Sequence, residues 1–157
     1  MSRNRKSSNE ESVAGSRGRT ILYAIAALIA AAGIAETTYL TAIHLAGAHV
    51  TCIASTGCSQ VLGSRFAVVA GVPLAAIGAL GYFTAFSAAT LAAFCYRWAS
   101  MIFAIVVGLM FLTTLWLLYA QAFLLRAYCD YCLLSAAMIF GLTAILVLLP
   151  PRPDAIR

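Results

Sequence analysis

Charged side chains are scarce in this sequence. Only 10% of its 157 residues are Asp, Glu, Lys or Arg, whereas 63% are apolar and the mean hydropathy is +0.95. Soluble domains carry about 25% charged residues, so a water-soluble domain is excluded. A chain of this length has room for only four or five membrane crossings of about 20 residues each, which also excludes a large transporter with internal repeats.

Apolar runs between charges and turn residues predict an all-α membrane protein with four membrane-spanning helices. The expected spans are approximately 20–48, 72–94, 99–125 and 131–149. The first run is long enough to cross the bilayer and has no evident cleavage site after it, so it is expected to be a retained helix rather than a secretory signal. The expected organisation is a disordered basic tail over 1–19, a four-helix bundle over 20–149 with a long loop between helices 1 and 2, and a C-terminal tail over 150–157.

Basic residues near the spans predict the orientation, because cytoplasmic segments carry an excess of Lys and Arg. With the N-terminus inside, the inner face carries Arg3, Arg5, Lys6, Arg17, Arg19, Arg97, Arg152 and Arg157, against Arg65 and Arg126 outside. The chain is therefore expected to be a multi-pass protein of the cell (inner) membrane with both termini cytoplasmic. The basic tail is interpreted as a topology signal beside lipid, so no nucleic acid partner is expected.

The five cysteines are unevenly distributed in this topology. Cys52 and Cys58 lie in the outer loop and Cys129 and Cys132 at the outer end of the fourth span, whereas Cys95 lies in the cytoplasmic turn. Disulfides persist on the oxidising side of the membrane, where four of the five are expected. This placement indicates two extracytoplasmic pairs with redox or structural roles.

The pair Cys129-Asp130-Tyr131-Cys132 has the C-x-x-C spacing of dithiol redox centres. If Asp130 is the N-cap of the fourth helix, Cys132 lies in its first turn, where free N–H groups and the helix dipole favour a thiolate. The Asp130 carboxylate opposes this, because it disfavours a second negative charge nearby. A purely structural disulfide has the same spacing.

A zinc site is an alternative for the outer cysteines. Zinc takes four ligands, and Cys52, Cys58, Cys129 and Cys132 could supply them, with His49 as a spare. The five residues between Cys52 and Cys58 exceed the common C-x2-4-C spacing, and no metal is expected.

Several ordered motifs together resemble the vitamin K epoxide reductase family, specifically its bacterial members. The motifs are Cys52-x5-Cys58 followed by Val61 and Ser64, Gly71-Val72-Pro73, Gly78 with Tyr82, Cys129-x-x-Cys132, and Tyr39-Leu40-Thr41 in the first span. The resemblance covers approximately 30–149. Other quinone-coupled disulfide enzymes with four helices have the two cysteine pairs in the opposite order.

The resemblance implies a redox relay and a quinone cofactor of the menaquinone or ubiquinone type. Cys52 would exchange with a thioredoxin-fold partner, Cys58 with Cys129, and Cys132 would lie against the quinone ring. Family members are often fused to a thioredoxin-like domain. Because this chain ends at Arg157, soon after its last span, the partner is expected to be a separate extracytoplasmic protein.

Four further residues are candidates for the quinone site. Met110 and Gln121 are about three helical turns apart on one helix face, and Gln121 could donate to a quinone oxygen or bond a neighbouring helix. The family counterparts of Ser64 and Phe66 lie near the ring, although Ser64 could cap backbone and Phe66 anchor at the membrane interface. Vertebrate members have tyrosine and asparagine where this chain has Ala136 and Leu74, so the resemblance does not extend to these two vertebrate substrate contacts, and epoxide reduction stays an open question.

Glu36 is an ionisable residue inside the first span, which is costly in lipid and marks a candidate functional residue. It could handle protons for quinone reduction, or it could be a neutral carboxyl hydrogen-bonded to a neighbouring helix.

Together these features predict a membrane thiol oxidase that reduces a quinone and supports disulfide bond formation. The alternative is a non-catalytic bundle whose outer cysteines form static disulfides or hold zinc.

Overall fold

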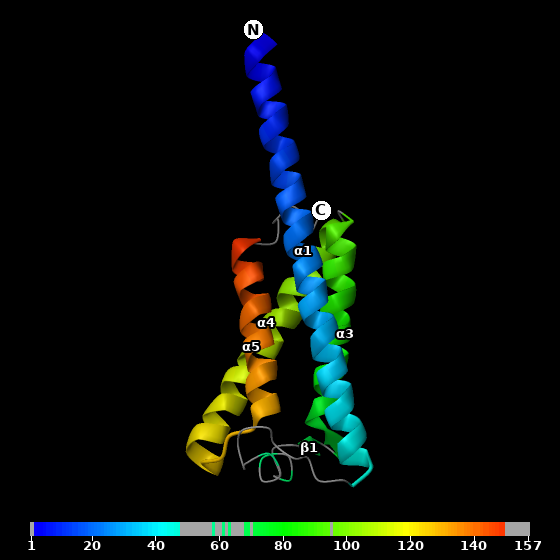
Figure 1. Ribbon diagram of the computed structural model, residues 1–157, viewed down its shortest axis with the longest axis vertical. Helices are drawn as coiled ribbons and strands as arrows, with labels where there is room; N and C mark the ends of the chain where they lie inside the picture. The colour runs from blue at the N-terminus through cyan, green and yellow to red at the C-terminus, as the bar shows by residue number, and fades with distance from the viewer. Residues whose placement is uncertain are drawn as a thin grey trace.

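Four long helices make up most of the protein (Figure 1). The computed structural model describes residues 2–47, 58, 61, 63, 68, 69, 71–94 and 96–149. The helices are α1 (Ser2–Leu45), α3 (Leu74–Ala93), α4 (Arg97–Tyr119), which continues as the π-helix η2 (Ala120–Leu125), and α5 (Asp130–Leu148). Each supplies one segment long and apolar enough to cross a membrane, namely Arg17–Leu45, Leu74–Ala93, Trp98–Leu125 and Asp130–Leu148. The predicted all-α membrane bundle is confirmed.

The helices run up and down between two ends of the molecule (Figure 1). The beginning of α1 and the end of α5 point to one end, whereas the beginning of α5, η2 and the short β1 strand lie at the other. Helix α1 packs along α3, and α4 is inclined so that its last turns lie away from α3 at the η2 end (Figure 1). We call this second end the loop end.

The first helix begins earlier than the sequence predicts. Residues 2–19 were expected to be disordered, but the structure has them as the first turns of α1. They contain no proline, and each residue added to an existing helix gains one hydrogen bond, so nothing in this segment ends the helix. The apolar, membrane-spanning part of α1 remains Arg17–Leu45.

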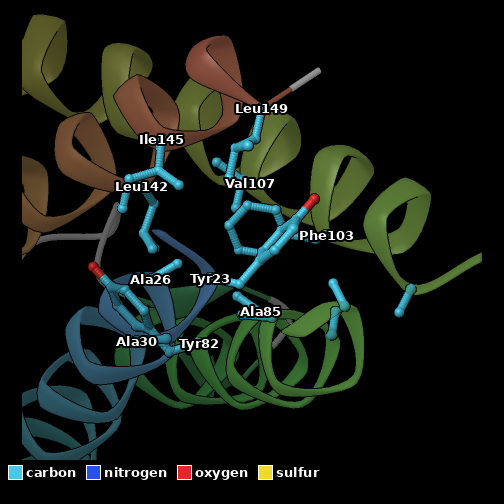
Figure 2. Packing of buried hydrophobic residues seen from close by; sticks show 14 of the residues in the cluster. Tyr23, Ala26, Ala30, Tyr82, Ala85, Phe103, Val107, Leu142, Ile145 and Leu149 are labelled. Carbon is cyan, nitrogen blue, oxygen red and sulfur yellow. The ribbon is translucent and has the colours of Figure 1, made fainter. Parts of the chain in front are cut away.

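Small residues let the helices approach closely, as is common in membrane bundles. Figure 2 shows Tyr23 of α1 against Phe103 of α4, with their ring centroids 5.9 Å apart and nearly perpendicular. The buried alanines around these rings are Ala26, Ala30, Ala85, Ala88 and Ala89. Gly33 makes similar room nearer the loop end, because a Cβ there would lie 2.5 Å from the Tyr82 ring.

Two short strands precede α3 at the loop end. β1 (Val68–Val69) pairs antiparallel with β2 (Val72–Pro73), and Gly71 in the turn has φ of 82°, a conformation that glycine adopts at little cost. The second span was predicted to start at Val72, but the helix begins at Leu74 because Val72 and Pro73 are in β2.

The third predicted span, 99–125, is not a uniform α-helix. After Tyr119 the chain widens into η2 and then reverses at Arg126, the one described non-glycine residue with positive φ (49°). The Ala127 N–H donates to the Gln121 carbonyl at 3.2 Å, which closes this corner before α5 begins. The corner places Ala127 and Cys129 beneath the bundle, where they are buried.

Candidate redox site

Cys129 and Cys132 lie at the beginning of α5, at the loop end. Cys129 is the N-cap residue, with extended backbone angles of −114° and 119°, and Asp130 is the first helical residue. The expectation that Asp130 is the N-cap is therefore wrong by one position, although Cys132 does lie in the first turn. Both sulfurs are free thiols, Cys129 fully buried and Cys132 partly buried.

Cys58 is brought to the same place from the long loop. It is disulfide-bonded and almost fully buried, and its partner is neither Cys129 nor Cys132, since both are free. It belongs to a small apolar cluster with Val61, Ala127 and Cys129, against which Cys132 also packs. A loop disulfide and a helix-end dithiol thus meet in one buried cluster, which we call the cysteine cluster.

The first motif cysteine has the more acidic sulfur. The Cys132 thiol, by hydrogen bonding to the Cys129 sulfur, lowers the pKa of Cys129 to about 7, and the amides of Tyr131 and Cys132 act in the same direction. Burial and the Asp130 carboxylate raise that pKa but are outweighed. The sequence placed the helix-stabilised thiolate at Cys132. In the structure the hydrogen bond from the Cys132 thiol and, after it, the free amides of the first turn favour a thiolate at Cys129 instead.

Gln121 stabilises the non-helical corner between η2 and α5, which leads into the dithiol. Its side chain is 3% exposed, and its Oε1 accepts a hydrogen bond from the Cys129 N–H at 3.3 Å. Only the carbonyl oxygen of the amide can accept from an N–H, so this bond fixes which end of the side chain faces the backbone. The Nε2 donor is therefore turned away from Cys129.

A cavity of about 740 Å³ lies among the helices next to the dithiol. Cys132, Gln121 and Met110 all line it, as do Leu74 and Ala136. The remaining walls are mostly aliphatic, with a few hydroxyl groups and the Tyr82 ring edge. The volume is in the range of about 300–1,000 Å³ typical of pockets for drug-sized molecules, and an apolar lining with a few polar groups suits an aromatic dione.

Two polar residues of this region were not singled out as site residues from the sequence. The Tyr82 hydroxyl donates to the Ser135 carbonyl at 3.1 Å and lies 2.9 Å from the Ser135 Oγ. Tyr82 is 1% exposed, and both residues line the cavity. Gly33 was the available signal, since a glycine in an apolar helix often accommodates a large side chain of a neighbour.

Several candidate residues fall outside the part of the chain that the structure describes. They are His49, Cys52, Ser64, Phe66 and Cys95. Within the described ranges there is no group of three or more side chains suited to hold a metal ion. The described thiol pair and the disulfide-bonded Cys58 make a redox-active membrane protein the class that this site best fits.

The comparison with known families agrees with that class. A model of the vitamin K epoxide reductase family matches residues 24–147, which is most of the chain and reaches from the first span into the fourth. The chain belongs to the vitamin K epoxide reductase family. No individual curated protein matches the chain. Members of this family are oxidoreductases that act with quinones.

Proposed function

We propose that this protein is a membrane thiol oxidase that passes electrons from a thioredoxin-fold protein to a quinone and so supports disulfide bond formation. The observation that carries the proposal is the position of the three described cysteines. Cys132 lines the apolar cavity and also packs against the cysteine cluster, in which Cys58 and Cys129 lie together. Electrons can therefore move between neighbouring sulfurs from the loop to the cavity.

The relay consists of balanced exchange steps. A reduced dithiol of the partner becomes a disulfide as it reduces the loop disulfide, which is proposed to join Cys52 and Cys58. Cys58 then attacks Cys129 of an oxidised C-x-x-C, so the Cys58–Cys129 bond forms and Cys132 leaves as a thiolate. When Cys52 attacks Cys58, the loop disulfide reforms and Cys129 leaves, which completes reduction of the motif pair. The low pKa of Cys129 favours this step, because a more acidic thiol is the better leaving group.

The final step returns the C-x-x-C to its disulfide. Oxidation of the Cys129 and Cys132 thiols forms one S–S bond and delivers two electrons and two protons, which reduce a quinone to a hydroquinone. In the proposed site, Cys132 faces the ring, Met110 supplies part of the apolar wall, and the Gln121 Nε2 donates to a ring oxygen. Ser64 and Phe66 are proposed to complete the site from the loop.

The proposed sidedness follows the distribution of basic residues. Both termini are cytoplasmic, and the loop end, with the cysteine cluster, faces the extracytoplasmic side of the cell membrane. The electron donor is then a separate extracytoplasmic thioredoxin-fold protein, and the acceptor is a menaquinone or ubiquinone of the lipid phase. An epoxide substrate is not proposed, because Leu74 and Ala136 line the cavity without offering a hydrogen bond.

Reconstitution tests the proposal. Purified protein in liposomes that contain a quinone is mixed with a reduced thioredoxin-fold protein, and quinol formation and partner oxidation are followed together. We expect one quinol per partner disulfide, loss of both signals in Cys58→Ala, and wild-type rates in the control Cys95→Ala, whose thiol is expected at the opposite membrane face. No thiol-dependent quinol formation in the wild-type protein would favour the non-catalytic bundle with structural disulfides or zinc.

A further inference from the structure

Glu36 is a half-buried acidic residue that the relay described above does not use. It lies in the second half of the membrane-spanning part of α1, toward the loop end. Both of its carboxyl oxygens are shielded from solvent, and neither has a hydrogen-bond partner. The alternative of a carboxyl hydrogen-bonded to a neighbouring helix therefore does not hold. A buried polar group without a partner is costly, so its presence calls for a functional explanation.

The surroundings of Glu36 are the redox groups themselves. It interacts electrostatically with Cys129 and Cys132 at the start of α5 and with Tyr82 of α3. Among the residues that the structure describes, these are the titratable groups of α3 and of the start of α5 that interact with Glu36. Glu36 itself does not line the cavity, whereas its neighbours Thr37, Tyr82 and Cys132 do. The carboxyl is thus close to the dithiol without forming part of the cavity wall.

Two hydroxyl residues, Tyr82 and Ser135, connect the surroundings of Glu36 with the cavity. The Tyr82 ring is held against Gly33, one turn before Glu36, and its hydroxyl is hydrogen-bonded to Ser135. Hydroxyl groups can donate and accept a proton at the same time. Tyr82 and Ser135 both line the cavity, so they can pass a proton between the Glu36 region and a bound molecule.

We propose that Glu36 accepts the proton that Cys132 loses when the dithiol is oxidised and returns it to the cavity through Tyr82 and Ser135. This inference rests on the proposed function. Oxidation of the two thiols releases two electrons and two protons, and reduction of a quinone to a hydroquinone consumes the same number. The Glu36 carboxylate becomes a carboxylic acid when it takes the Cys132 proton and a carboxylate again when it releases it. The Cys129 proton exchanges with solvent, which supplies the second proton of the hydroquinone.

Single-turnover kinetics test the role. The full-length protein in liposomes is reduced with a dithiol, freed of reductant and mixed with a soluble ubiquinone analogue over a pH series. General acid–base groups contribute about 10²–10⁴-fold to rate. We therefore expect Glu36→Gln to slow quinol formation by about 10²-fold and to alter the pH profile, with quinone affinity unchanged. Glu36→Asp, which keeps the carboxyl, should recover a large part of the rate and the profile.

Two further variants test the path. Tyr82→Phe keeps the ring against Gly33 but removes the hydroxyl, and we expect it to slow the same step. The matched control is Thr143→Val, which removes a hydroxyl bonded within α5 and away from the cavity and should leave the rate unchanged. A Glu36→Gln rate within about twofold of wild type, or a slower rate that tracks lost quinone affinity with an unchanged pH profile, would contradict the proposal.

Infrared difference spectra of the wild-type protein give a readout that needs no substitution. Reduction of the quinone by the dithiol should be accompanied by a carboxylic acid signal that appears and decays. If the wild-type protein reduces quinone without any carboxyl signal, the proposed role of Glu36 is contradicted, whereas the proposed thiol oxidase function is supported. If the wild-type protein reduces no quinone, both the role of Glu36 and the thiol oxidase function are contradicted.

Discussion

The Cys129 N–H donates a hydrogen bond to the Gln121 Oε1 at 3.3 Å, which ties the end of one membrane-spanning segment to the beginning of the next. The same glutamine accepts the Ala127 N–H through its backbone carbonyl. These two bonds hold a non-helical corner in a buried place, where unpaired backbone groups would be costly. Gln121 therefore positions the dithiol and also lines the cavity next to it.

Substitution of Gln121 should separate these two roles. Gln121→Met keeps the size of the side chain but leaves the Cys129 N–H without a partner, and we expect a loss of about 1–3 kcal/mol of stability. Gln121→Glu keeps an acceptor oxygen and removes the Nε2 donor, so quinone affinity should fall more than stability. Thermal unfolding and quinone titration measure the two effects. Equal stability of all three proteins would contradict the bracing role.

The thiol exchange should depend on pH through Cys129. The thiolate is the reactive form, and the pKa of Cys129 is lowered to about 7, so its alkylation by a small reagent should reach half its maximal rate near pH 7 and fall below it. Cys132→Ala removes the thiol that donates to the Cys129 sulfur and should move the midpoint upward. Mass spectrometry at Cys129 gives the rate. A midpoint above about 8.5, the ordinary thiol value, would contradict the stabilised thiolate.

Close packing at Gly33 can be tested against a glycine with free space. A Cβ at Gly33 would lie 2.5 Å from the Tyr82 ring, so Gly33→Ala should displace that ring and lower stability by about 1–3 kcal/mol. The control is Gly108→Ala, since nothing lies within 4 Å of the Cβ it would gain, and alanine favours a helix. Thermal unfolding of both variants in detergent decides the point. A Gly33→Ala protein as stable as Gly108→Ala would show that the contact is not tight.

Much of the fold was predictable because lipid imposes simple rules. Apolar runs of bilayer length must be helices, so the four spans were predicted from composition and charge alone. The helical start of α1 at Ser2 and the π-helix η2 were missed, because neither changes the apolar pattern. The reversal at Arg126 was missed for a related reason, since an arginine at positive φ has no sequence signal.

The residue types of the site could be predicted from the sequence, whereas the contacts among those residues could not. Spacing and rarity singled out four described residues. Three of them, Cys132, Met110 and Gln121, line the cavity, and the fourth, Cys129, lies in the adjoining cysteine cluster. The pairing of Tyr82 with Ser135 joins residues 53 positions apart, which spacing cannot reveal. The preference for a Cys129 thiolate depends on the hydrogen bond from the Cys132 thiol and on a one-residue difference in the N-cap, both finer than sequence patterns resolve.

The order of the sulfurs is the central claim, and disulfide mapping in Cys132→Ala tests it most directly. In this variant the Cys129 thiolate can attack Cys58 of the loop disulfide, so the Cys58–Cys129 bond forms and Cys52 leaves as a thiol, but no Cys132 thiol remains to release the new bond. In protein purified without reductant and supplied with quinone, mass spectrometry should find a Cys58–Cys129 disulfide and a free Cys52 thiol, with quinone bound and unreduced. In the parallel variant, Cys129→Ala, quinone reduction by the protein partner should be lost. A Cys58–Cys132 disulfide in wild-type intermediates, or a Cys129→Ala protein that still reduces quinone with that partner, would contradict the account.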